Sequence, residues 1–290
     1  MASGNHVENP FEFVLEKLGW AAADIGRVML PRRDRHVGQA APVVRKIAAR
    51  DLWEALRKGV ADVGATRDDV LFIAVIYPVA GLVLARLLAS YDLLPLVFPL
   101  ASGFALIGPF AAIGLYEMSR RREAGAKVSW LTALEVFRSP ALGSILGLGA
   151  ILLALFGLWL ATAYQIYLAT LGGEPPQTIA AFERSVFETA GGWALIAAGM
   201  GVGLLFAVLA FALSVVSFPL LLDRDVGLKT AIVTSFRAIA ANPGTMILWG
   251  VVVAGLLLLG SLPALVGLIF IMPLLGHATW HLYRKVIAEA

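Results

Sequence analysis

The chain has 290 residues, of which 59% are hydrophobic and 15% are charged, and its net charge is +3 at pH 7. Soluble domains contain about a quarter charged residues, so this composition indicates a membrane protein. The chain has no cysteine, which excludes disulfides, thiolate-ligated zinc or iron–sulfur centres and covalently attached c-type haem. The small net charge does not indicate a nucleic-acid partner, and we expect none.

The first segment of the chain, residues 1–68, is expected to be cytoplasmic and to contain two helices. The first helix is predicted over 11–30, where Pro31 ends it. The second is predicted over 43–63, because apolar residues recur at helical spacing: Leu52, Leu56, Val60 and Val63. One thin apolar stripe cannot build a large core, so we expect this segment to lie against the membrane or on the helix ends.

The segment 69–285 is expected to form an all-α transmembrane domain with six spans. A spanning helix needs about 20 apolar residues, and five long stretches of this segment carry almost no charge. Gly260-Ser261-Leu262-Pro263 divides the last stretch, because proline cannot continue a helix and glycine eases a turn. The predicted spans are 70–90, 94–118, 141–170, 191–221, 244–260 and 264–283.

The lysine and arginine residues predict the orientation. With the N-terminus inside, the cytoplasmic segments hold 21 of the 23 basic residues, whereas Arg184 lies in an outer loop and Arg86 near the outer end of the first span. Basic residues concentrate on the cytoplasmic side of membrane proteins, so both termini are predicted to be cytoplasmic. The first charge-free apolar run begins only at Val70, which predicts that no cleaved signal peptide is present.

A faint repeat precedes three of the spans. Amphipathic segments at 127–140 and 229–243 end in Ser-Pro and Asn-Pro, and 52–67 is a weaker third copy. The repeated unit would be an interfacial helix followed by a pair of spans, which implies a pseudo-threefold bundle. The alternative is that cytoplasmic loops between spans are commonly amphipathic.

Two histidines in the last span are the candidate metal ligands. His277 and His281 are four residues apart, so both imidazoles lie on one helix face and suit a metal or a haem iron. Alternatively, they lie beside Tyr283 at the cytoplasmic helix end, where polar aromatic side chains reach lipid headgroups or cap carbonyls. The remaining histidines, His6 and His36, are in the first segment, so no further histidine ligand is evident and we expect no cofactor.

The basic run Arg120, Arg121 and Arg122 follows the second span. These residues are candidates for binding anionic lipid headgroups, although such runs also fix topology. Glu117 lies one turn before Arg121 and is expected to form an ion pair with it. The sequence contains no phosphate loop, HExxH motif or recognisable nucleophile–base pair, so we do not expect an enzyme.

Proline and glycine are frequent within the spans, including Pro109, Pro219 and Pro273. Broken helices can build a substrate site, but close helix packing is the alternative, and Gly143-xxx-Gly147 and Gly199-xxx-Gly203 favour it. Ionisable residues are absent from the middle of the predicted spans, and proton-coupled transporters usually have one there.

Three motifs carry a resemblance to a known family: Gly114-Leu115-Tyr116-Glu117 with Ser119-Arg120-Arg121-Arg122-Glu123, Phe218-Pro219-Leu220-Leu221-Leu222-Asp223-Arg224-Asp225, and Gly276-His277-Ala278-Thr279-Trp280-His281-Leu282-Tyr283-Arg284. From about Val44 to its end, the chain resembles a family of bacterial integral membrane proteins classified as a domain of unknown function. Some members carry the label of a cytochrome c oxidase subunit. The resemblance implies six spans in a bacterial inner membrane and no established activity.

These observations lead us to expect a non-enzymatic accessory, assembly or membrane-organising protein. Its expected partners are membrane lipids and either a membrane-protein complex or further copies of the chain. Two alternatives stay open: a transporter or channel for a small neutral or weakly polar solute, and a haem- or metal-binding respiratory accessory subunit.

Overall fold

The computed structural model describes residues 42–65, 91–129, 132–133, 135–172, 176–262 and 266–288. All of them belong to one compact unit, Ala40–Ala290. The described part of this unit consists of helices, and an antiparallel bridge joins Val44 to Ile287. The described helices are α2 (Ala49–Ala65), η1 (Tyr91–Leu96), α4 (Val97–Ala111), α5 (Ile113–Glu123), η2 (Glu135–Arg138), α7 (Leu142–Leu171), α8 (Ile179–Phe187), α9 (Ala190–Ser214), α10 (Ser217–Asp223), α11 (Leu228–Ala241), α12 (Pro243–Ser261) and α13 (Leu268–Val286).

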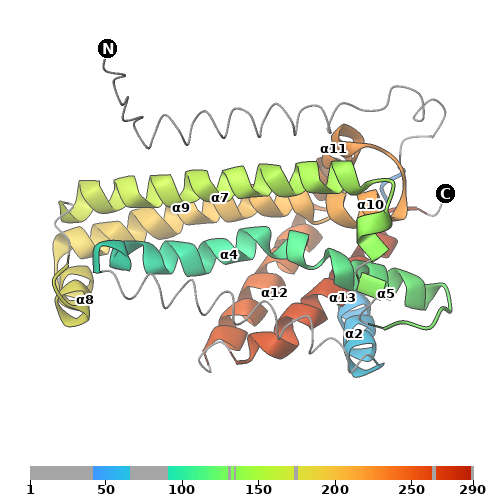
Figure 1. The fold of residues 1–290 in the computed structure, drawn as a ribbon, viewed down its shortest axis with the longest axis horizontal. Helices are drawn as coiled ribbons and strands as arrows, with labels where there is room; N and C mark the ends of the chain where they lie inside the picture. Colours follow the sequence, from blue (N-terminus) through green and yellow to red (C-terminus); the bar gives the residue numbers. More distant parts are fainter. Residues whose placement is uncertain are drawn as a thin grey trace, which may run out of the picture. The chain divides into compact units, whose positions relative to one another are not determined.

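Within the described residues, three stretches of helix are long and apolar enough to cross a membrane: Leu142–Leu171, Ala190–Asp223 and Pro243–Ser261. The helices α7 and α9 run side by side, and α4 packs against both (Figure 1). Large apolar side chains on α9 and α12 are exposed, among them Leu204, Leu205 and Leu259. Such surfaces are costly in water and suit a lipid environment, so the chain is a membrane-embedded protein with several apolar helices.

The predicted span at 70–90 lies outside the described residues. Of the other five predicted spans, two are each divided between two helices. The span at 94–118 is divided, because Ala112 separates α4 from α5 three residues after Pro109; proline lacks the N–H that a continuous helix needs. The span at 191–221 is divided between α9 and α10, where Pro219 lies in the first turn of the new helix, a position that tolerates proline.

The remaining predicted spans, 141–170, 244–260 and 264–283, correspond to α7, α12 and α13. The amphipathic segment before α12 is helical, as expected, and forms α11. By contrast, the described helix nearest the start of α7 is the four-residue η2. The described helices therefore confirm the apolar spans at α7, α9 and α12, but they do not confirm six spans or the repeat of three units.

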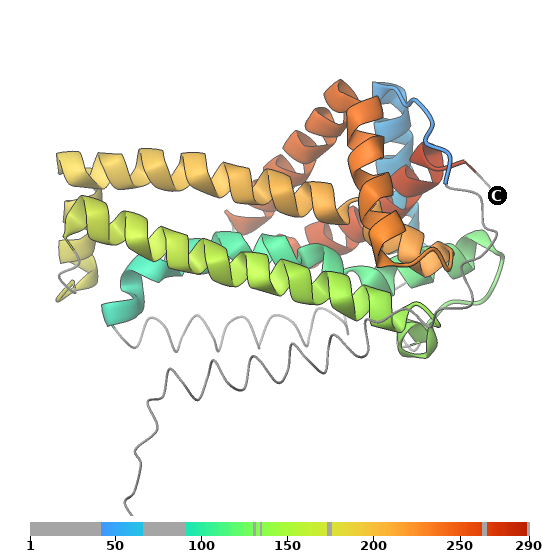
Figure 2. The same ribbon diagram turned by 90° about the horizontal axis from the view of Figure 1, so that it is seen from above.

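The described basic segments gather at one end of the long helices. Figures 1 and 2 show α2, α5, α10 and α11 together at this end, which we call the polar end, and α8 at the opposite end. The short helix α8 is not predicted from the sequence; Thr178 caps it by accepting a hydrogen bond from the Ala181 N–H.

The helix α2 packs against the C-terminal half of α13 within the polar end. Its buried residues are Leu52, Ala55, Gly59 and Asp62. The predicted apolar stripe is therefore wrong in part: Leu52 is buried, but Val60 is 58% exposed. The reason is close approach of the two backbones, since a Cβ at Gly59 would lie 2.9 Å from the backbone N of Ala278. Small residues on α2 permit this contact, and larger apolar residues at the same positions would prevent it.

Candidate functional site: a buried polar cluster

The polar end brings together the three motifs that carry the family resemblance. They lie on α5, α10 and α13, and α13 packs against both of the other helices. Tyr283 Oη on α13 donates a 2.6 Å hydrogen bond to Asp223 on α10. Trp280 Nε1 and Arg284 Nε contact Glu123 on α5 at 3.2 Å and 3.1 Å. Residues far apart in the sequence therefore form one hydrogen-bonded unit.

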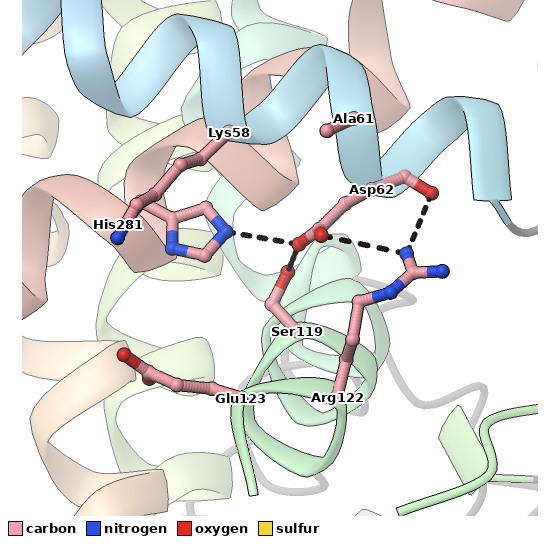
Figure 3. A pocket seen from close by; sticks show the side chains of 7 residues that line it. All are labelled: Lys58, Ala61, Asp62, Ser119, Arg122, Glu123 and His281. Atoms are coloured by element: carbon pink, nitrogen blue, oxygen red, sulfur yellow. Dashed lines mark hydrogen bonds and ion pairs between the residues drawn. The ribbon is translucent and has the colours of Figure 1, made fainter. Parts of the chain in front are cut away.

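A carboxylate from α2 lies at the centre of a buried polar cluster (Figure 3). Asp62 Oδ2 accepts a 2.6 Å hydrogen bond from Ser119 Oγ and lies 2.9 Å from His281 Nε2. Ser119 Oγ also lies 2.7 Å from His277 Nδ1. Asp62, Ser119, His277 and His281 are all less than 9% exposed, so α2, α5 and α13 meet through a cluster that is shielded from water. We call these four residues the Asp62 cluster.

The chemistry of the partners assigns the protons in this cluster. A carboxylate only accepts, so the Nε2–H of His281 donates to Asp62. Ser119 gives its one proton to Asp62, so it accepts from the Nδ1–H of His277. The remaining ring nitrogen of His281, Nδ1, is buried and has no hydrogen-bond partner among the described residues. A cavity of about 250 Å³ adjoins the cluster and is lined by Asp62, Ser119, His281, Lys58 and Arg122, among others.

The surroundings of Asp62 stabilise its charged form. Burial acts to raise the pKa of Asp62, but the hydrogen bonds from His281 and Ser119 and the nearby imidazoles act more strongly. The pKa of Asp62 is therefore lowered below its usual value. Arg122 also binds Asp62: its Nη1 donates to the Asp62 backbone carbonyl at 3.0 Å and lies 3.4 Å from Oδ1.

The structure places the two predicted histidine ligands within the Asp62 cluster rather than at a lipid interface. They share a helix face, as their spacing predicts, and contact Ser119 and Asp62. Within the described part of the chain, His, Asp and Glu side chains form no group of three or more that could hold a metal ion. Metal binding by His277 and His281 stays a prediction, and Nδ1 of His281 is the nitrogen left for a ligand.

The basic run after the second predicted span is held in ion pairs. The predicted pair of Glu117 with Arg121 is confirmed at 2.7 Å. Arg120 binds the same carboxylate through Nε and Nη2, each at 2.7 Å, and Arg121 also contacts Glu135. With Arg122 bonded to Asp62, all three candidate headgroup ligands have protein partners, and their headgroup role stays a prediction.

Sequence reasoning missed Asp62 and Ser119. Asp62 follows Leu52, Ala55 and Gly59 at intervals of three to four residues, on the face that α2 buries. A carboxylate on a buried helix face is uncommon and requires partners. The helical spacing of Asp62 from Leu52, Ala55 and Gly59 could have indicated that it is buried, but the larger residues Leu56 and Val60 indicated a different face of α2. Ser119 lies in the first resemblance motif, but no spacing rule pointed to its contacts, because its partners are 57 and 158 residues away.

Comparison with known proteins is consistent with the membrane assignment. Neither a curated protein nor a solved structure matched the chain. A family model matches residues 97–223, which run from the start of α4 to the end of α10 and include the first motif and most of the second. The model is described as that of a predicted integral membrane protein family (DUF2189), and this segment is similar to it.

Proposed function

We propose that the chain is a six-span protein of a bacterial inner membrane with both termini in the cytoplasm. The observation that supports this topology is the gathering of α2, α5, α10 and α11 at one end of the long helices. The basic residues of α2, α5 and α11 match the positive-inside pattern. Reporter fusions at Glu174 and Gly227 should report the outer and the cytoplasmic side, and the reverse result would overturn the orientation.

Within that topology, we assign the protein a non-enzymatic role as an accessory, assembly or membrane-organising protein. The observation that carries this role is that buried and half-buried charged and polar side chains of the polar end bind one another. Glu117, Asp62 and Asp223 each have two or more protein partners. Paired buried groups hold helices in one arrangement, which suits a rigid platform.

The test is a mild-detergent affinity purification from native membranes, with co-purifying proteins quantified. A partner present in a fixed stoichiometric ratio supports the accessory role, particularly if Asp62→Ala releases it while Gly64→Ala, a change on the same helix with open space around it, does not. Partner-free protein that carries a solute across proteoliposome membranes would contradict the proposal.

The second candidate function is a transporter or channel for a small neutral or weakly polar solute. The observation that favours it is the meeting of two helix breaks. Ala112 separates α4 from α5, and Val215 and Val216 separate α9 from α10. The two breaks lie close together, because the ring centroids of Phe110 and Phe218, which lie beside them, are 6.1 Å apart. Discontinuous helices build solute sites in several transporters. Flux across a broad solute panel tests this candidate, and inert proteoliposomes would contradict it.

The third candidate is a haem- or metal-binding accessory subunit, which the buried pair His277 and His281 favours. Absorption spectroscopy and elemental analysis of protein purified without chelators test it. A sample with neither a Soret band nor bound metal would eliminate this candidate.

A further inference from the structure

A second cavity lies at the polar end, beside the start of α7. It has a volume of about 400 Å³ and is lined by residues of α5, η2, the turn before α7, α10 and the segment after α10. Sites for small molecules have volumes of roughly 300–1,000 Å³, so the cavity is large enough for a compact polar group. We call it the α7 cavity.

The charges that line the α7 cavity balance, and most of them are paired. Four arginines and four acidic residues line it. Glu117 binds Arg120 and Arg121, Arg121 also contacts Glu135, and Arg224 Nε lies 3.5 Å from Asp223. Two lining residues of opposite charge, Arg138 and Asp225, have no ion pair or hydrogen bond from their side chains to any described residue. The cavity therefore offers one positive and one negative group to a ligand.

The backbone at the cavity favours a phosphate near Arg138. The 30-residue helix α7 begins there. Ser139 accepts hydrogen bonds from the N–H groups of Ala141 and Leu142, and Ala141 at the N-cap provides no side-chain cap for the N–H groups that follow. The first N–H groups of a helix and its dipole attract anions. Phe137, next to Arg138, is 67% exposed. An exposed aromatic residue beside an arginine is typical of the membrane–water boundary, where the ring meets acyl chains and the cation meets headgroups.

We propose that the α7 cavity binds the zwitterionic phosphoethanolamine headgroup of a membrane phospholipid. The phosphate lies on Arg138 and the start of α7, and the primary ammonium donates to Asp225. A headgroup without a cation leaves Asp225 without a partner beside the phosphate, which costs affinity. A trimethylammonium group has no N–H to donate to Asp225, so phosphatidylethanolamine binds better than phosphatidylcholine or phosphatidylglycerol. The inference rests on the proposed topology, which places this end at the cytoplasmic leaflet.

The experiment measures lipid binding to the full chain in detergent by native mass spectrometry, with phosphatidylethanolamine, phosphatidylglycerol and phosphatidylcholine titrated separately. Arg138→Gln should weaken phosphatidylethanolamine and phosphatidylglycerol alike, by about tenfold, because both lose a charge-assisted bond to phosphate. Asp225→Asn should weaken only phosphatidylethanolamine, again by about tenfold. Arg237→Gln, an exposed arginine on α11, is the matched control and should bind like the parent chain. Thermal unfolding of each variant checks that it folds.

Two results would overturn the inference. One is parent-like phosphatidylethanolamine binding by both Arg138→Gln and Asp225→Asn. The other is soluble glycerophosphoethanolamine binding as tightly as the lipid, which would assign the cavity to a free metabolite headgroup. A wrong topology can be distinguished from a wrong lipid site. A reporter fusion at Gly227 would then report the outer side, while binding of phosphatidylethanolamine in detergent would be unaffected.

Discussion

Replacing Asp62 by alanine removes the acceptor that joins α2 to α5 and α13. Asp62 accepts a hydrogen bond from Ser119 at 2.6 Å and contacts His281 at 2.9 Å, and both partners are buried. Hydrogen bonds to charged groups contribute about 1.5–3 kcal/mol each. The bond from Arg122 adds little, because that side chain is 33% exposed.

The expected cost is about 3–5 kcal/mol, since truncating one member of a buried polar pair leaves the others unsatisfied. A loss of about 3 kcal/mol corresponds to roughly a hundredfold change in the equilibrium for detaching α2. The cost falls on the contact between α2 and α13, because the Asp62 cluster joins these elements.

Hydrogen exchange of the full chain in detergent, followed by mass spectrometry, measures this detachment. Amides of α2 should exchange roughly a hundredfold faster in Asp62→Ala, whereas amides of α7 should keep their protection. The matched control is Glu54→Gln, also on α2, which removes an exposed ion pair with Lys285 and should change exchange little. If Asp62→Ala exchanges like Glu54→Gln, the Asp62 cluster does not hold α2 in place.

Three further outcomes are expected from thermal or chemical denaturation in detergent. Because the pKa of Asp62 is lowered in the folded chain, the ionised carboxylate stabilises the fold fully above about pH 4, and this stabilisation is lost as the pH falls further. Asp62→Asn should lose this acid dependence of the unfolding free energy, and a variant with the same pH dependence as the parent chain would contradict the assignment. Gly59→Ala should destabilise the fold by about 1–3 kcal/mol, because the new Cβ would lie 2.9 Å from the backbone of Ala278. Gly64→Ala, whose Cβ would have nothing within 4 Å, should stabilise it by up to about 1 kcal/mol, and equal effects of the two substitutions would refute the close approach of α2 and α13. Glu117→Gln should lower the free energy of unfolding by about 2–4 kcal/mol, since the 2% exposed carboxylate of Glu117 binds two arginines. A loss below about 1 kcal/mol, as for an exposed ion pair, would argue against this stabilising role.

The sequence by itself determined the membrane class, the apolar helices α7, α9 and α12, and the ion pair of Glu117 with Arg121. These features depend on quantities that are local along the chain. Hydropathy adds up over a window of about 20 residues, and a spacing of four places two side chains on one helix face whatever surrounds them.

Tertiary structure alone decided which face α2 buries and what surrounds the histidines. The pattern of large apolar residues pointed to Val60, but the fit of Gly59 against Ala278 put Asp62 inside. His281 and Asp62 are 219 residues apart, and no spacing rule connects them. A buried carboxylate is stable only where several chain segments supply donors together, and that condition exists only after the helices have packed.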